Sequence, residues 1–160
     1  MKALRILYTL VVLFIFGSTT AQNKTEKPHT SIETLLNSKN FEFIANTALP
    51  LGQPPKNLVG SNYSITFSPE MVISNMPFYG RSYSDMALGR DKGMRFKGMP
   101  EIFTVKNENK GYVAETRVEN ENDIYTLLLT VSESGFATLT LKTNDRQTTT
   151  YEGEVVSIRE

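Results

Sequence analysis

The sequence predicts an all-β domain of antiparallel strands with one short helix at its beginning. Apolar and polar residues alternate with a period of two in several segments, which is the pattern of strands that bury one face. Short polar turns separate these segments at regular intervals, as in antiparallel sandwiches and barrels. No long segment with helical spacing interrupts them, which argues against parallel βαβ units and the nucleotide sites built on such units.

The N-terminus has the three parts of an export signal. Lys2 and Arg5 give a positive start, an apolar run follows, and small residues lead to Ala21. We therefore expect residues 1–21 to be a signal peptide that is cleaved between Ala21 and Gln22. The apolar run is about eleven residues long, whereas a membrane-spanning helix needs about 20. We expect no transmembrane anchor in the mature chain, and a location outside the cytoplasm.

The mature chain divides into a leader and a single domain. Residues 22–29 are polar and lack apolar spacing, so we interpret them as a flexible leader. Residues 30–160 have the size of one ordinary domain. The chain has 17 Lys and Arg against 17 Asp and Glu, and the two signs are interspersed. This distribution lacks the basic footprint of a nucleic-acid binder. The chain has no cysteine, so disulfides and cysteine-linked lipids are excluded.

A short helix is expected to open the domain, followed by strands. Thr30 and Glu33 form a capping box with Thr30 as the N-cap, and Ile32, Leu35 and Leu36 follow at helical spacing. The expected strands cover residues 41–46, 63–67, 71–74, 94–97, 102–106, 112–118, 124–131, 136–142 and 148–158. The linkers between the later strands are short and polar, which predicts an antiparallel meander.

The meander is compatible with two architectures. We favour a partly open barrel that resembles a lipocalin, and a two-layer β-sandwich is the alternative, because both require one inward face per strand. The chain has no Trp and therefore lacks the Gly-x-Trp motif that a lipocalin usually carries near its first strand. Inward faces are expected to include Leu127 and Leu129 on one strand and Leu139 and Leu141 on the next.

Residues 76–83 are the one stretch that the strand rhythm does not explain. Pro77 fixes φ, Gly80 permits a turn, and residues 85–93 are typical of a loop, so we expect this stretch to be displayed at a sheet edge or barrel mouth. Aromatic faces beside a cation suit an anionic or carbohydrate-like ligand, or a partner protein. In the structural alternative, Phe78 and Tyr79 close one end of the core. The candidate ligand-binding residues are Phe78, Tyr79, Arg81, Tyr83, Arg146 and Tyr151.

Arg146 and Tyr151 belong to this set on one condition. If the last strand closes onto the first, both residues approach the loop at residues 78–83.

Catalytic and metal-binding patterns are weak in this sequence. The only histidine is His29, in the leader, which argues against a Ser-His-Asp triad and against sites built from several histidines. We expect no catalytic residue, metal or cofactor. The favoured function is a non-catalytic binding or interaction module whose partner is a small ligand or an envelope protein. The alternatives are a purely structural or stress-related envelope protein and, third, a hydrolase with paired carboxylates. The oligomeric state stays open.

Four segments resemble the domain-of-unknown-function 4251 family. They are Pro77–Tyr83, Tyr63–Phe67, Gly135–Leu139 and Arg146–Gly153, and the resemblance covers nearly all the mature chain. Proteins of this family are small, exported and found mainly in Bacteroidetes. The resemblance therefore implies the periplasm or outer envelope of such a bacterium. It implies no activity, because the family carries none.

Overall fold

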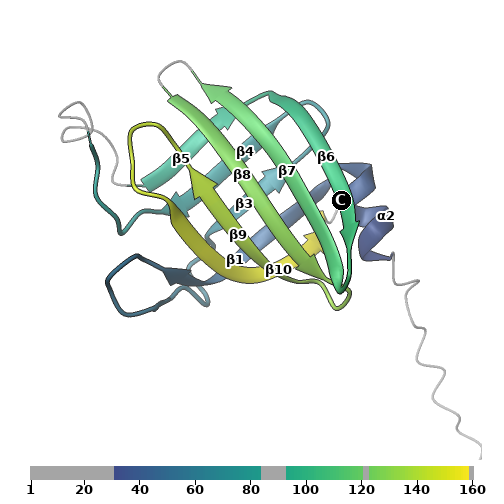
Figure 1. The fold of residues 1–160 in the computed structure, drawn as a ribbon, viewed down its shortest axis with the longest axis horizontal. Coiled ribbons are helices and arrows are strands. Elements are labelled where there is room, and N and C mark those ends of the chain that lie inside the picture. Colours follow the sequence, from purple (N-terminus) through teal and green to yellow (C-terminus); the bar gives the residue numbers. More distant parts are fainter. Residues whose placement is uncertain (1–30, 84–92, 121–122, 159–160) are drawn as a thin grey trace, which may run out of the picture.

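The framework of the protein is one antiparallel sheet that curls into a nearly closed barrel, in a computed structural model that describes residues 31–83, 93–120 and 123–158 (Figure 1). Its elements are α2 (Ile32–Ser38), β1 (Phe41–Leu49), β2 (Lys56–Asn57), β3 (Ser64–Phe67), β4 (Val72–Pro77), β5 (Gly93–Gly98), β6 (Pro100–Glu108), β7 (Gly111–Asn120), β8 (Asp123–Ser132), β9 (Phe136–Lys142) and β10 (Thr149–Ser157). The predicted partly open barrel is confirmed. The strands lie in a single sheet, so the sandwich alternative is not what the chain forms.

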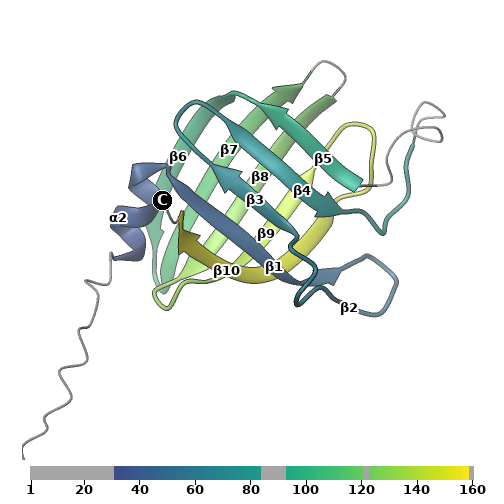
Figure 2. The ribbon, with the colours of Figure 1, turned by 180° about the vertical axis from the view of Figure 1, so that it is seen from behind.

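The first strand in the sequence, β1, pairs with the last strand in the sequence, β10. The strand order is β5-β4-β3-β1-β10-β9-β8-β7-β6, and β2 pairs only with β1. Two antiparallel meanders, β3 to β5 and β6 to β10, are therefore joined through β1 (Figure 2). This pairing brings the beginning and the end of the domain side by side.

The helix α2 begins one residue later than the sequence predicts. Its N-cap is Ser31, whose Oγ accepts a hydrogen bond from the Thr34 amide at 3.2 Å. The expectation that Thr30 is the N-cap is thus wrong, because the hydroxyl that reaches the amide of the third helical residue belongs to Ser31. Leu35 and Leu36 are buried as expected.

All nine expected strands are present, with boundaries that differ by a few residues. The largest differences are that β1 continues to Leu49 and β4 continues to Pro77. In β1 the register shifts between Ala45 and Thr47, and this bulge breaks the alternation that marks a strand in the sequence. The short strand β2 was not predicted, since two residues carry no periodicity.

Gly153 is the point where β1 and β10 approach most tightly. A Cβ atom at this glycine would lie 1.9 Å from the carbonyl oxygen of Ile44. Gly153 pairs with Ala45, directly at the bulge in β1. Any side chain at this position would push the two central strands apart, so the glycine permits the contact that joins the two meanders.

Side chains bridge the seam between the terminal strands of the sheet. β5 pairs only with β4, and β6 pairs only with β7. Phe96 of β5 stacks on Tyr125 of β8 with ring centroids 3.9 Å apart. Phe103 of β6 contributes a second aromatic contact. The centroid of its ring lies 6.1 Å from those of Phe41 on β1 and Phe67 on β3. Aromatic packing thus links the two sides of the seam where strand pairing stops.

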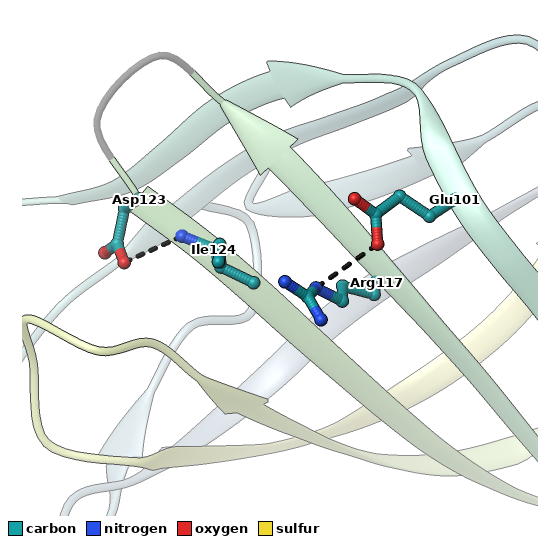
Figure 3. Close-up of polar contacts among 4 residues, drawn as sticks. All are labelled: Glu101, Arg117, Asp123 and Ile124. Carbon is teal, nitrogen blue, oxygen red and sulfur yellow. Dashed lines mark hydrogen bonds and ion pairs between the residues drawn. The ribbon is translucent and has the colours of Figure 1, made fainter.

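The barrel interior is filled by the inward faces of the strands. The expected core residues of the late strands are buried: Tyr125, Leu127, Leu129, Val131, Ala137, Leu139 and Leu141. The outer face carries polar and charged residues, including an ion pair between Arg117 Nε and Glu101 Oε2 at 3.2 Å (Figure 3). Among the described residues, no helix is long and apolar enough to span a membrane.

Replacing Gly153 by alanine should destabilise the domain. The added methyl group must displace the Ile44 carbonyl, and we expect a loss of about 2 kcal/mol or more in the free energy of unfolding, measured by urea denaturation. The neighbouring exposed variant Glu154→Ala is the control and should change stability by less than about 0.5 kcal/mol. Equal stability of the two variants would contradict the close packing of β1 against β10.

Candidate functional site

The candidate site lies where the chain leaves β4 and where it enters β10. Residues 78–83 follow β4, and residues 143–148 precede β10. Ser82 and Arg146 form an isolated antiparallel bridge. The Tyr83 amide donates to the Asp145 carbonyl at 2.8 Å, and the Gln147 amide donates to the Arg81 carbonyl at 2.9 Å. Two loops that are distant in sequence are therefore tied together at a fixed register.

Two contacts hold the Arg146 side chain in this site. Its guanidinium lies 5.4 Å from the centre of the Phe78 ring and donates a hydrogen bond to the carbonyl of Gly93 at the start of β5. A Cβ atom at Gly80 would lie 2.8 Å from the Phe78 ring. The glycine thus gives the ring room to fold back, and the Phe78 ring in turn supports the Arg146 cation.

Tyr151 lies beneath the two loops and is fully buried. Its hydroxyl donates a 2.6 Å hydrogen bond to the carbonyl of Pro77, the last residue of β4. Burial raises the pKa of the Tyr151 phenol above its ordinary value of 10.0. The side chain stays neutral and connects β10 to the start of the candidate loop.

The loop that carries Arg146 is fixed by local hydrogen bonds. Thr143 Oγ1 accepts from the Asp145 amide at 3.2 Å and from the Arg146 amide at 2.9 Å. Asp123 Oδ1, at the start of β8, accepts from the Ile124 amide at 2.8 Å (Figure 3) and from the Asn144 amide at 3.3 Å. These contacts anchor the loop to β8, so the backbone bridge at Arg146 is built on a rigid support.

Arg81 and Tyr83 are the exposed members of the candidate set. Tyr83 is 69% exposed, and Arg81 is also exposed. Phe78 and Tyr79 are half-buried and pack against the core, and the Tyr79 carbonyl accepts a 2.8 Å hydrogen bond from Gln53 Nε2. The guanidinium of Arg81 makes no hydrogen bond or ion pair with the residues that the structure describes.

The structure brings the six predicted residues to one corner and separates them into two groups. The closure of β10 onto β1 is confirmed, and with it the approach of Arg146 and Tyr151 to the loop. Phe78 and Tyr79 pack on the core, as the structural alternative expects of these two residues, whereas its other part, a pairing of Arg81 with Asp85, involves a residue outside the described ones. Whether any of the six binds a ligand stays a prediction. The expected loop at residues 85–93 lies outside the described residues, except for Gly93.

Sequence reasoning missed the residues that hold this corner from the other side. Asp145 and Gln147 supply the backbone groups of the bridge, and Gln147 Oε1 also accepts from the Arg81 amide at 3.3 Å. The available signal was the turn-forming run Thr143-Asn144-Asp145 before the last strand, which is typical of a structured turn. Across residues 31–83, 93–120 and 123–158, no cluster of three or more potential metal ligands occurs.

Removing the Tyr151 hydroxyl should lower the stability of the domain without creating a large cavity in the core, because the ring is retained. Tyr151→Phe loses the hydrogen bond to the Pro77 carbonyl, and we expect a loss of about 1 kcal/mol in the free energy of unfolding near neutral pH.

The difference in the free energy of unfolding between Tyr151→Phe and the parent protein should become smaller above pH 10. The pKa of Tyr151 is raised in the folded state, so its contribution is complete below the unfolded pKa of 10.0 and declines as the unfolded phenol ionises above it. Urea denaturation of both proteins between neutral pH and pH 11 measures this difference. A gap that widens with rising pH would contradict the buried neutral phenol.

The comparisons with known proteins agree on one family. The sequence model described as "Domain of unknown function (DUF4251)" matches residues 23–155. The fold is similar to the crystal structure, at 1.95 Å resolution, of a DUF4251 family protein from Bacteroides eggerthii DSM 20697, with a TM-score of 0.61, 13% identity, and coverage of 78% of this chain and 84% of that chain. No curated protein matches the chain. Since the family match spans most of the sequence, the chain belongs to the DUF4251 family.

Proposed function

We propose that this protein is an exported, non-catalytic binding module of the bacterial envelope, and that it contacts its partner through Arg81 and Tyr83. The export signal at residues 1–21 supports a location in the periplasm or outer envelope. The chain has no cysteine, so the domain does not depend on disulfide formation in that compartment. Cleavage between Ala21 and Gln22 belongs to this proposal, and the intact mass of the envelope-purified protein tests it.

The observation that carries the proposal is that two exposed side chains, Arg81 and Tyr83, extend from a backbone that is hydrogen-bonded to the facing loop. Arg81 and Tyr83 flank Ser82, which is bridged to Arg146. Both backbone positions are fixed by hydrogen bonds to the facing loop. A rigid backbone lowers the entropy lost when exposed side chains are immobilised on a partner. Tyrosine and arginine are also the side chains most enriched among residues that dominate protein interfaces.

The other four candidate residues act as positioning residues in this proposal. Phe78 supports Arg146, Tyr151 holds Pro77, and Tyr79 packs on the core. The buried aromatic residues thus fix the geometry, and the exposed pair makes the contact. This division explains why the aromatic-rich stretch can serve both the core and recognition.

A photo-crosslinking amino acid at position 83 tests this surface. The full chain carrying Tyr83→p-benzoylphenylalanine, expressed with its export signal in a Bacteroides host, should give a discrete crosslinked adduct in the envelope fraction. Adding Arg81→Ala should reduce the adduct yield by about tenfold, because arginine contacts at interface centres are typically worth more than 1 kcal/mol.

The same crosslinker at Ile102 is the matched control. Ile102 is 65% exposed on β6, away from the bridge between the two loops, and it should give no comparable adduct. Equal adducts at both positions, or none at position 83, would reject the surface and favour a purely structural envelope protein. Both variants should keep the parental unfolding temperature, because the replaced side chains are exposed.

A further inference from the structure

A concave feature lies on the outer face of the sheet, away from the Arg81 corner. It is a groove of about 640 Å³ over β6, β7, β8 and β9, a size within the range of about 300–1,000 Å³ typical of small-molecule pockets. It lies at the β8–β9 turn, whereas the Arg146 loop follows the opposite end of β9. At this turn a Cβ atom on Gly135 would lie 3.3 Å from Ile32 Cδ1 of α2, so the turn lies on the same side of the barrel as the helix (Figure 1).

Gly111 is one of the residues that line the groove. This residue lies between Glu108 of β6 and Ser132 of β8 in the strand register. A Cβ atom at Gly111 would lie 2.2 Å from the carbonyl oxygen of Val131, so any side chain would collide with the neighbouring strand. This position therefore requires glycine, because the backbone of β8 occupies the place of a side chain.

The walls combine one exposed aromatic ring with neutral polar groups. Phe136 is 53% exposed at the edge of the groove. Thr130 and Thr138 pair with each other across β8 and β9, and their hydroxyls can both donate and accept hydrogen bonds. The charged residues of the lining, Glu108 and Lys110, have opposite signs. The groove is thus amphipathic and electrically balanced.

This chemistry disfavours other classes of ligand. An extended peptide gains most from main-chain hydrogen bonds at a free strand edge, but the groove lies over β7 and β8, which are paired on both sides. An anion would meet the Glu108 carboxylate as well as the Lys110 ammonium. A purely apolar ligand would leave the hydroxyls of Thr130 and Thr138 without water or a partner.

We propose that this groove is a binding site for a neutral saccharide, with Phe136 stacking on one face of a sugar ring. The C–H groups on a sugar face carry partial positive charge, which matches the negative face of an aromatic ring. The sugar hydroxyls can donate to and accept from Thr130 and Thr138. The site is independent of the Arg81 surface and adds a ligand class to the binding module.

Chemical-shift mapping of the isotope-labelled mature protein tests the site. Maltose, lactose and N,N′-diacetylchitobiose are the neutral saccharide probes, and trialanine is the peptide probe. At least one disaccharide should shift the amide resonances of Gly111, Thr130 and Thr138 in a saturable manner. Phe136→Ala should weaken that binding by about fivefold, which corresponds to the roughly 1 kcal/mol of an aromatic contact, whereas Phe136→Tyr should retain it.

The controls separate this proposal from the Arg81 surface. The double variant Arg81→Ala/Tyr83→Ala should bind the disaccharide like the parent protein, and Phe136→Ala should leave the crosslink at position 83 unchanged. The unshifted spectrum of the remaining core shows that each variant is folded. The proposal is overturned if no disaccharide shifts these amides, if only trialanine shifts them, or if Phe136→Ala binds as well as the parent.

Discussion

The pairing of β1 with β10 is the interaction on which the rest of this structure depends. Without it the sheet would divide into β3 to β5 with β1 on one side and β6 to β10 on the other. The pairing needs the close approach at Gly153, and it places Tyr151 opposite Ala48 on β1 and Leu139 on β9. Because the paired strands come from the two ends of the domain, the barrel forms only after most of the chain is present, and its formation is dominated by contacts between residues distant in sequence.

The same pairing creates the Arg81 corner and shapes its chemistry. Once β10 lies beside β1, the Tyr151 hydroxyl reaches the Pro77 carbonyl and the loop before β10 meets the loop after β4. Arg146 then contacts Phe78 and Gly93, whereas the Arg81 side chain stays exposed. The Gly111 groove, by contrast, depends only on the local meander of β6 to β9. The two surfaces therefore arise from different parts of the topology and can be altered separately.

Much of the fold was predictable because period-two alternation is strong in β7 to β10, where apolar residues such as Leu127 and Leu139 face inward. The boundaries failed where this local signal stops, at the bulge of β1 and in the two residues of β2. The aromatic and glycine content of residues 76–83 singled out this corner in the sequence. The sequence did not indicate which of its side chains are exposed and which pack on the core. Alternation cannot show that Arg146 stacks on Phe78, because that contact joins residues distant in sequence. The exposure of Phe136 could be inferred from the sequence, because alternate residues of a strand face opposite sides and the next residue, Ala137, faces inward.

Native-state hydrogen exchange of the β1 and β10 amides tests the central role of this strand pair most directly. If the pairing joins both halves of the barrel, the amides of Glu42 and Ile44 on β1, and of their partners Val156 and Glu154 on β10, should exchange only through global unfolding. Their free energy of opening and denaturant dependence should then equal those of the core of β8. Exchange of the β10 amides at a clearly lower free energy, while β8 and β9 remain protected, would show that β10 detaches locally. That result would contradict the account.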